Sequence, residues 1–103
     1  MAFFGDNACE IWCRFNGTGS IAINDDYNVT SLNDNGTGDY TVNFSITMSS
    51  TNYALVYGTS GMILNTSNAM STTTSQRVRS LHRDNSFQLL DVQMFSVVIF
   101  GDR

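Results

Sequence analysis

The sequence predicts an all-β fold, an antiparallel β-sandwich or small barrel of about 7–9 short strands in a single domain spanning residues 1–103. The composition is the first indication. Ser, Thr, Asn and Gly are abundant, Lys and Pro are absent, and Glu10 is the only glutamate, so strong helix formers are scarce. The second indication is a segment in which apolar and polar residues alternate strictly, and the third is a repeated tetrapeptide, NGTG.

The clearest strand is "DYTVNFSI", residues 39–46. Its apolar and polar residues alternate: Tyr40, Val42, Phe44 and Ile46 against Thr41, Asn43 and Ser45. A period of two residues is typical of an antiparallel strand with one buried face.

The remaining strands are shorter and are separated by polar segments. In chain order they are "EIWCRF" (10–15), "SIAIN" (20–24), "VTSL" (29–32), "YALVYG" (53–58), a segment from Arg77, "SFQLL" (86–90) and "MFSVVIF" (94–100). The apolar residues of the last segment are nearly continuous, which predicts a strand covered on both faces.

The two NGTG copies are predicted to be hairpin turns. Their turn residues are Asn16, Gly17 and Gly19 in the first copy, and Asn35, Gly36 and Gly38 in the second. Asn-Gly tolerates positive φ at both positions, and a second glycine allows a bulge. The predicted hairpins join 10–15 to 20–24 and 28–32 to 39–46.

Two ligand-binding readings of NGTG are disfavoured. A dinucleotide-binding loop needs a helix directly after its glycines, whereas "SIAIN" alternates. A helix–loop–helix calcium site needs a closing glutamate, and Glu10 is elsewhere. No cofactor and no metal ligand is therefore predicted.

Cys9 and Cys13 are the only cysteines. On one strand they point the same way but lie roughly 13 Å apart, at ~3.3 Å per residue, which is too far for a disulfide. We expect two small buried thiols.

The charge pattern disfavours a nucleic-acid partner, and the lack of a long apolar run disfavours insertion into a membrane. The formal net charge is −4, and the most basic segment is "RVRSLHR", residues 77–83, which suits a solvated strand face or an interface. No apolar run approaches the ~20 residues that a membrane-spanning helix needs.

No catalytic residues are predicted. His82 is the only histidine, Ser60 in "GTSGM" does not complete a G-x-S-x-G elbow, and the adjacent Asp25 and Asp26 would point to opposite faces of a strand. We expect a protein that is not an enzyme.

Several segments together resemble a domain of bacteriophage tail-fibre proteins, commonly their distal C-terminal part. The matching elements are Trp12, "FNGTG" (15–19), "NVTS" (28–31), "DNGTGDYTVNF" (34–44) and Asn52-Tyr53, and "VQMFSVVIFGD" (92–102) is similar to the last strand of the family. The resemblance implies a β-sandwich-like virion protein, tail-fibre-tip-like and homotrimeric, that binds a host-surface glycan or protein.

Receptor contacts are expected in the irregular segment "NTSNAMSTTTSQ" (65–76) and near it. The candidates are Asn65, Asn68 and Arg83, whose side chains can hydrogen-bond sugar hydroxyls.

Family members usually carry the domain after an anchor and a shaft, whereas here it starts almost at Met1. A second possibility is therefore a capsid decoration (cement) or small tail-tip protein that binds other virion subunits and no receptor. Either way the protein is expected on the phage particle.

Overall fold

The computed structural model describes residues 9–59, 62–63, 70–81, 89 and 91–101. Within these residues the chain forms strands and no α-helix, which confirms the predicted all-β class. The strands are β1 (Cys9–Asn16), β2 (Ala22–Tyr27), β3 (Val29–Gly36), β4 (Asp39–Phe44), β5 (Ala54–Thr59), β6 (Met62–Ile63), β7 (Ser75–Leu81) and β8 (Phe95–Phe100).

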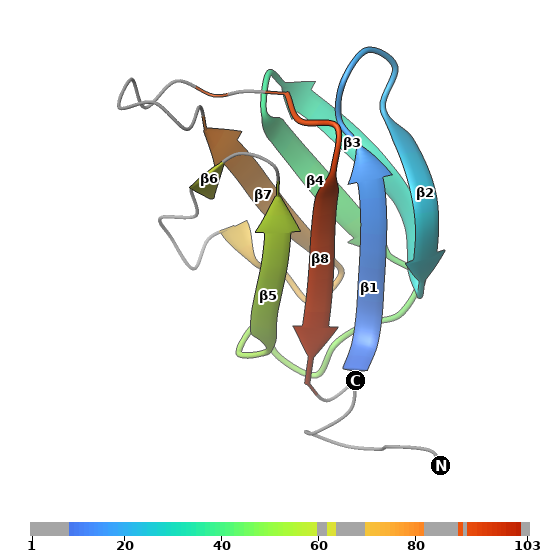
Figure 1. Cartoon of the computed structure of the whole chain (residues 1–103). Coiled ribbons are helices and arrows are strands. Elements are labelled where there is room, and N and C mark those ends of the chain that lie inside the picture. Colours follow the sequence, from blue (N-terminus) through green and yellow to red (C-terminus); the bar gives the residue numbers. More distant parts are fainter. Residues whose placement is uncertain (1–8, 60–61, 64–69, 82–88, 90, 102–103) are drawn as a thin grey trace.

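The strands form two antiparallel sheets, one in front of the other in Figure 1. The first sheet has the order β2-β1-β8-β5, and the second has the order β3-β4-β7-β6. Chain neighbours β1 and β2 pair with each other, as do β3 and β4. β8 returns from the far end of the sequence to lie between β1 and β5. The arrangement is sandwich-like.

The core lies between the sheets and follows from the alternation of each strand. The first sheet contributes Ile11, Cys13, Phe15, Phe95, Val97 and Ile99, and the second contributes Tyr40, Val42, Phe44 and Val78. Phe15 stacks on Phe95 at 5.2 Å between ring centroids and meets Tyr40 edge-on at 5.0 Å. Full burial of such a side chain stabilises the fold by roughly 1.5–3 kcal/mol.

Asn28 turns the chain from the first sheet into the second. It lies between β2 and β3 and has a φ of 60°, in the left-handed region. Its Nδ2 donates to the Glu10 carbonyl oxygen at 2.8 Å, and its own carbonyl accepts from Ser45 N at 2.8 Å. Asparagine suits this corner because it tolerates positive φ and reaches a neighbouring strand.

Replacing Asn28 with alanine is expected to lower the free energy of unfolding by about 2 kcal/mol, through left-handed strain and the lost hydrogen bond. Asn28→Gly loses the bond but not the conformation, so its cost should be about 1 kcal/mol. Urea titration of both variants checks the order. An alanine variant as stable as the glycine variant would contradict this role.

The two cysteines differ, which corrects the prediction of two buried thiols. Both are free, but only Cys13 is buried, while Cys9 is exposed. The pairing of β1 with β8 shifts register between Cys9 and Ile11, so Cys9 leaves the inward-facing series of Ile11 and Cys13. Burial raises the pKa of Cys13 to about 12, so its thiol stays protonated at neutral pH.

The last strand is covered on one face only. Phe95, Val97 and Ile99 of β8 are buried, whereas Val98 is partly exposed and Phe100 is 36% exposed. The prediction of two covered faces is therefore wrong for the single chain. The strand predicted over residues 86–90 lies, apart from Leu89, outside the described residues.

Candidate functional site

The two NGTG copies differ in conformation although their sequences are identical. Asn16 ends β1 and the loop continues to residue 21, whereas Asn35 and Gly36 belong to β3 and only Thr37 and Gly38 form the turn. Positive φ occurs at Gly19 (61°), Gly36 (134°) and Gly38 (66°).

Neither asparagine has positive φ, which corrects the expected turn chemistry. Among the described non-glycine residues, only Asn28 does. Because positive φ is needed at both central residues of a type I′ turn, and Thr37 lacks it, the second copy is not such a turn. The left-handed positions are taken by the second glycine of each copy and by Gly36.

Hydrogen bonds of Tyr40 and Asp91 connect the two NGTG copies at one end of the sandwich. The Tyr40 hydroxyl lies 3.0 Å from Asp91 Oδ1 and 3.2 Å from the Gly17 carbonyl oxygen. The same Oδ1 accepts from Gly38 N at 2.7 Å. Gly17 N donates to the Val92 carbonyl oxygen at 2.8 Å. In Figure 1 the orange segment that leads into β8 crosses this end between the two loops.

Burial, and then the Asp91 carboxylate, raise the pKa of Tyr40 well above its usual range. The phenol therefore stays protonated and donates a hydrogen bond, which suits a structural tie. The sequence gives no local signal for the hydrogen bond between Tyr40 and Asp91, because the two residues are 51 positions apart.

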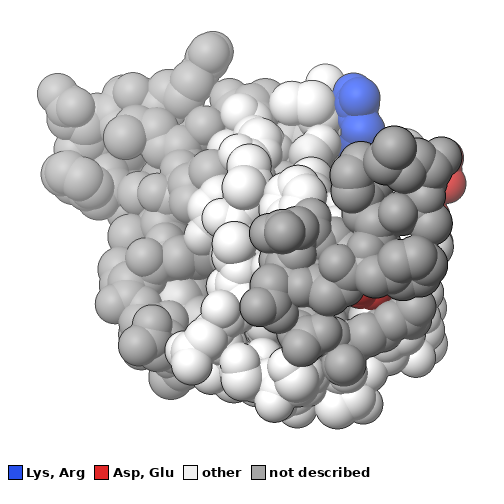
Figure 2. Space-filling model, turned by 90° about the horizontal axis from the view of Figure 1, so that it is seen from below, with Lys and Arg blue, Asp and Glu red and all other residues white. Residues whose placement is uncertain are grey.

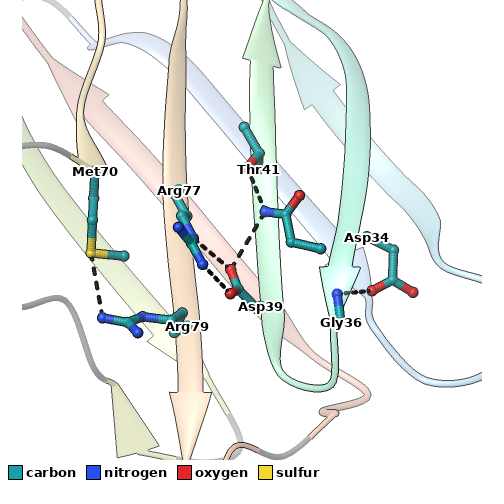
Figure 3. Close-up of polar contacts among 8 residues, drawn as sticks. Asp34, Gly36, Asp39, Thr41, Met70, Arg77 and Arg79 are labelled. Carbon is teal, nitrogen blue, oxygen red and sulfur yellow. Dashed lines mark hydrogen bonds and ion pairs between the residues drawn. The ribbon is translucent and has the colours of Figure 1, made fainter.

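The outer face of the second sheet is polar and hydrogen-bonded (Figure 3). Arg77 on β7 binds Asp39 on β4 through two bonds, Nε to Oδ1 at 2.9 Å and Nη2 to Oδ2 at 2.5 Å. Asn35 Nδ2 lies 3.4 Å from Asp39 Oδ1 and 2.6 Å from Thr41 Oγ1. Arg77 and Arg79 share this face, as their spacing on a strand predicts.

The ion pair makes stability depend on pH. Hydrogen bonding from Arg77, and to a lesser degree from Asn35, lowers the pKa of Asp39 against the opposing effect of burial. Because the pKa of Asp39 is lower in the folded protein than in the unfolded chain, the ion pair contributes its full stabilisation above the unfolded-state pKa of about 3.9. This stabilisation is lost as pH falls through the folded-state pKa.

Asp39→Asn is therefore expected to be less stable than the wild type at neutral pH, with the difference shrinking as pH falls below about 4. Thermal unfolding of both proteins between neutral and strongly acidic pH measures this. Asp26→Asn, on exposed strand β2, is the control and should leave most of the acid sensitivity in place. A difference for Asp39→Asn that is constant with pH would exclude the ion pair as its source.

The outer face of the first sheet is apolar along one row of cross-strand neighbours. Trp12 pairs with Tyr27 on one side and with Val98 on the other, and Val98 pairs with Val56. Trp12 is 36%, Tyr27 46% and Val56 55% exposed. The row thus crosses all four strands, from edge strand β2 to edge strand β5.

A second row extends this surface, and a polar row borders it. Phe100 pairs with Cys9 and with Ala54, and both neighbours are exposed. On the other side, Arg14 pairs with Asp25 and with Ser96. We call the two apolar rows the apolar face, comprising Tyr27, Trp12, Val98, Val56, Cys9, Phe100 and Ala54.

Two hollows adjoin the apolar face. One, of about 330 Å³, is lined by Cys9, Trp12, Cys13, Arg14, Ser96, Val97 and Val98. The other, of about 350 Å³, lies at the end of the sandwich and is lined by Ser49, Ser50, Asn52, Tyr53, Ala54, Phe100 and Gly101. Viewed from that end, the described surface is mostly uncharged, with the Arg and acidic side chains toward one side (Figure 2).

The receptor-contact candidates Asn65, Asn68 and Arg83 lie outside the described residues, as does His82. Within the described part of the chain, no three His, Cys, Asp or Glu side chains gather as metal ligands would. Nor do the described residues include a helix long and apolar enough to cross a membrane.

Comparison with known proteins gives no match. No protein-family model, curated protein or solved structure is significantly similar to this chain.

Proposed function

We propose that the chain is a bacteriophage virion protein of tail-fibre-tip type that assembles as a homotrimer through the apolar face and binds a host-surface glycan or protein. It acts by binding and assembly and not as an enzyme. The exposed row from Tyr27 to Val56 is the observation that carries the assembly part of this proposal.

The apolar face has the composition of an interface core. A large aromatic side chain, Trp12, lies in a row with Tyr27 and two valines, and the neighbouring row holds the cross-strand pair of Arg14 and Asp25. Aromatic residues are enriched at protein interfaces, and tryptophan is frequent among the residues that dominate binding energy. Single exposed apolar residues are ordinary, but a contiguous row across four strands favours a protein partner.

The phage assignment rests on the sequence resemblance, and the contacts between its motifs support it. Phe15 and Gly17, from "FNGTG", both contact Tyr40, from "DNGTGDYTVNF". Asn28, which opens "NVTS", makes the corner between the sheets. The matching residues therefore form a connected framework, as expected if the resemblance reflects a shared fold.

Receptor binding requires a surface left free in the trimer. The polar face of the second sheet lies on the opposite side of the sandwich from the apolar face, and it offers the Arg77 guanidinium, which is 48% exposed. The candidates Asn65, Asn68 and Arg83 add hydrogen-bonding groups of the kind that recognise sugar hydroxyls or polar protein surfaces.

A capsid decoration or small tail-tip protein is the second candidate. The apolar face favours it equally, because a capsid or tail subunit could cover the same row in place of further copies of this chain. In that case the polar face would contact no receptor.

Copy number per particle distinguishes the candidates. Quantitative mass spectrometry of purified virions, scaled to the major capsid protein, should find only a handful of trimers if the protein is a tail adhesin. Copies in the hundreds would instead indicate capsid decoration. Absence from the particle would overturn both proposals.

A further inference from the structure

Asn35-Gly36 and Asn16-Gly17 are the two Asn-Gly pairs of the chain, each within the same tetrapeptide. Asn-Gly is the sequence at which asparagine most readily deamidates, because glycine leaves the following amide nitrogen unshielded. That nitrogen attacks the side-chain carbonyl carbon, and ammonia leaves. The resulting five-membered succinimide is opened by water to aspartate or isoaspartate. The reaction needs the backbone around the pair to move.

We propose that Asn35 is a deamidation site of the folded protein and that Asn16 is protected by the fold. The two pairs have the same local sequence, so the difference arises from their surroundings.

Gly17 is held on two sides. Its amide donates to the Val92 carbonyl oxygen at 2.8 Å, and the residue is buried. A Cβ built on it would overlap the phenol ring and hydroxyl of Tyr40, so the ring packs directly against the backbone. Ring closure at Asn16 therefore requires the Gly17–Val92 and Gly17–Tyr40 contacts to open first.

Gly36 has room to move. It is exposed, and a Cβ built on it would meet no atom within 4 Å. Its amide donates to the exposed side chain of Asp34 at 3.1 Å (Figure 3). The pairing of β3 with β4 also shifts register between Asp34 and Gly36, so the ladder is already irregular here.

The product changes the polar face. Asn35 presents its amide to Asp39 at 3.4 Å and to Thr41 at 2.6 Å. A carboxylate in its place removes a donor to Asp39 and sets two negative charges side by side. The net charge becomes one unit more negative than −4. An isoaspartate would also lengthen the backbone next to the turn.

Incubation of the purified chain at mildly alkaline pH tests the proposal. Chymotryptic cleavage after Phe15, Tyr27, Leu32 and Tyr40 places the two pairs in separate peptides, 16–27 and 33–40. Tandem mass spectrometry then follows conversion at each site. In the folded protein Asn35 should convert at least about tenfold faster than Asn16, the ratio given by about 1.4 kcal/mol of extra protection.

The same chain in denaturant is the matched control, because the identical NGTG sequences should then convert at similar rates. Asn35→Gln should abolish the signal in peptide 33–40, since glutamine does not form the five-membered ring. Equal rates in the folded protein, faster conversion at Asn16, or no conversion at Asn35 would each overturn the proposal. A rate ratio that persists in denaturant would do so as well.

Discussion

Replacing Gly17 with alanine is expected to lower the free energy of unfolding by about 3 kcal/mol, the upper range for overpacking a rigid site. The added methyl group would occupy the position of the Tyr40 phenol. Tyr40 is fully buried between Phe15 and Phe95, so its ring cannot swing aside without disturbing the core. Displacing it would also break the hydroxyl's bond to Asp91. Chemical denaturation measures the loss.

Gly19→Ala is the matched control in the same loop. Gly19 has a φ of 61° but open space around it, so alanine should cost only left-handed strain, about 1–2 kcal/mol. Combining Gly17→Ala with Tyr40→Phe should cost less than the sum of the single substitutions, because removing the hydroxyl relieves part of the overlap. A Gly17→Ala variant as stable as the wild type would show that this close approach is absent.

Val56→Asp is expected to weaken self-association at least about tenfold, which corresponds to a loss of about 1.4 kcal/mol in the free energy of association. Val56 is 55% exposed at the edge-strand end of the apolar face, so the fold of the single chain should tolerate the change at a cost below about 1 kcal/mol. Buried in an interface, the carboxylate would lose its hydration without a partner. Analytical ultracentrifugation over a concentration series measures the effect.

The control for Val56→Asp adds the same charge to the other sheet. Asn33→Asp lies on exposed β3 and is nearly isosteric, so it tests whether added charge alone disturbs assembly. It should leave association unchanged. Equal weakening by both variants would place the interface elsewhere or attribute the effect to net charge.

Much of the fold could be predicted because the strands follow from the local alternation of apolar and polar residues. The alternation of Tyr40, Val42 and Phe44 correctly predicts the buried face of β4. The apolar segments 53–58 and 94–100 likewise coincide closely with β5 and β8. These signals depend on the next one or two residues along the same strand.

What sequence reasoning missed depends on pairing between distant strands. Trp12 and Val98 are 86 residues apart, and only the register of β1 with β8 sets them side by side. The bulge that exposes Cys9 is equally invisible in the segment 10–15. The conformation of NGTG could not be predicted from NGTG alone, because Tyr40 and Asp91 decide how closely Gly17 is packed.

Assembly through the apolar face is tested most directly by the molar mass of the wild-type chain in solution, with the fluorescence emission of its single tryptophan recorded in parallel. We expect a mass three times 11.4 kDa and a blue-shifted Trp12 emission that moves to longer wavelength as the trimer is diluted apart. A monomer at every concentration, with the emission of a water-exposed indole throughout, would contradict the proposed trimer.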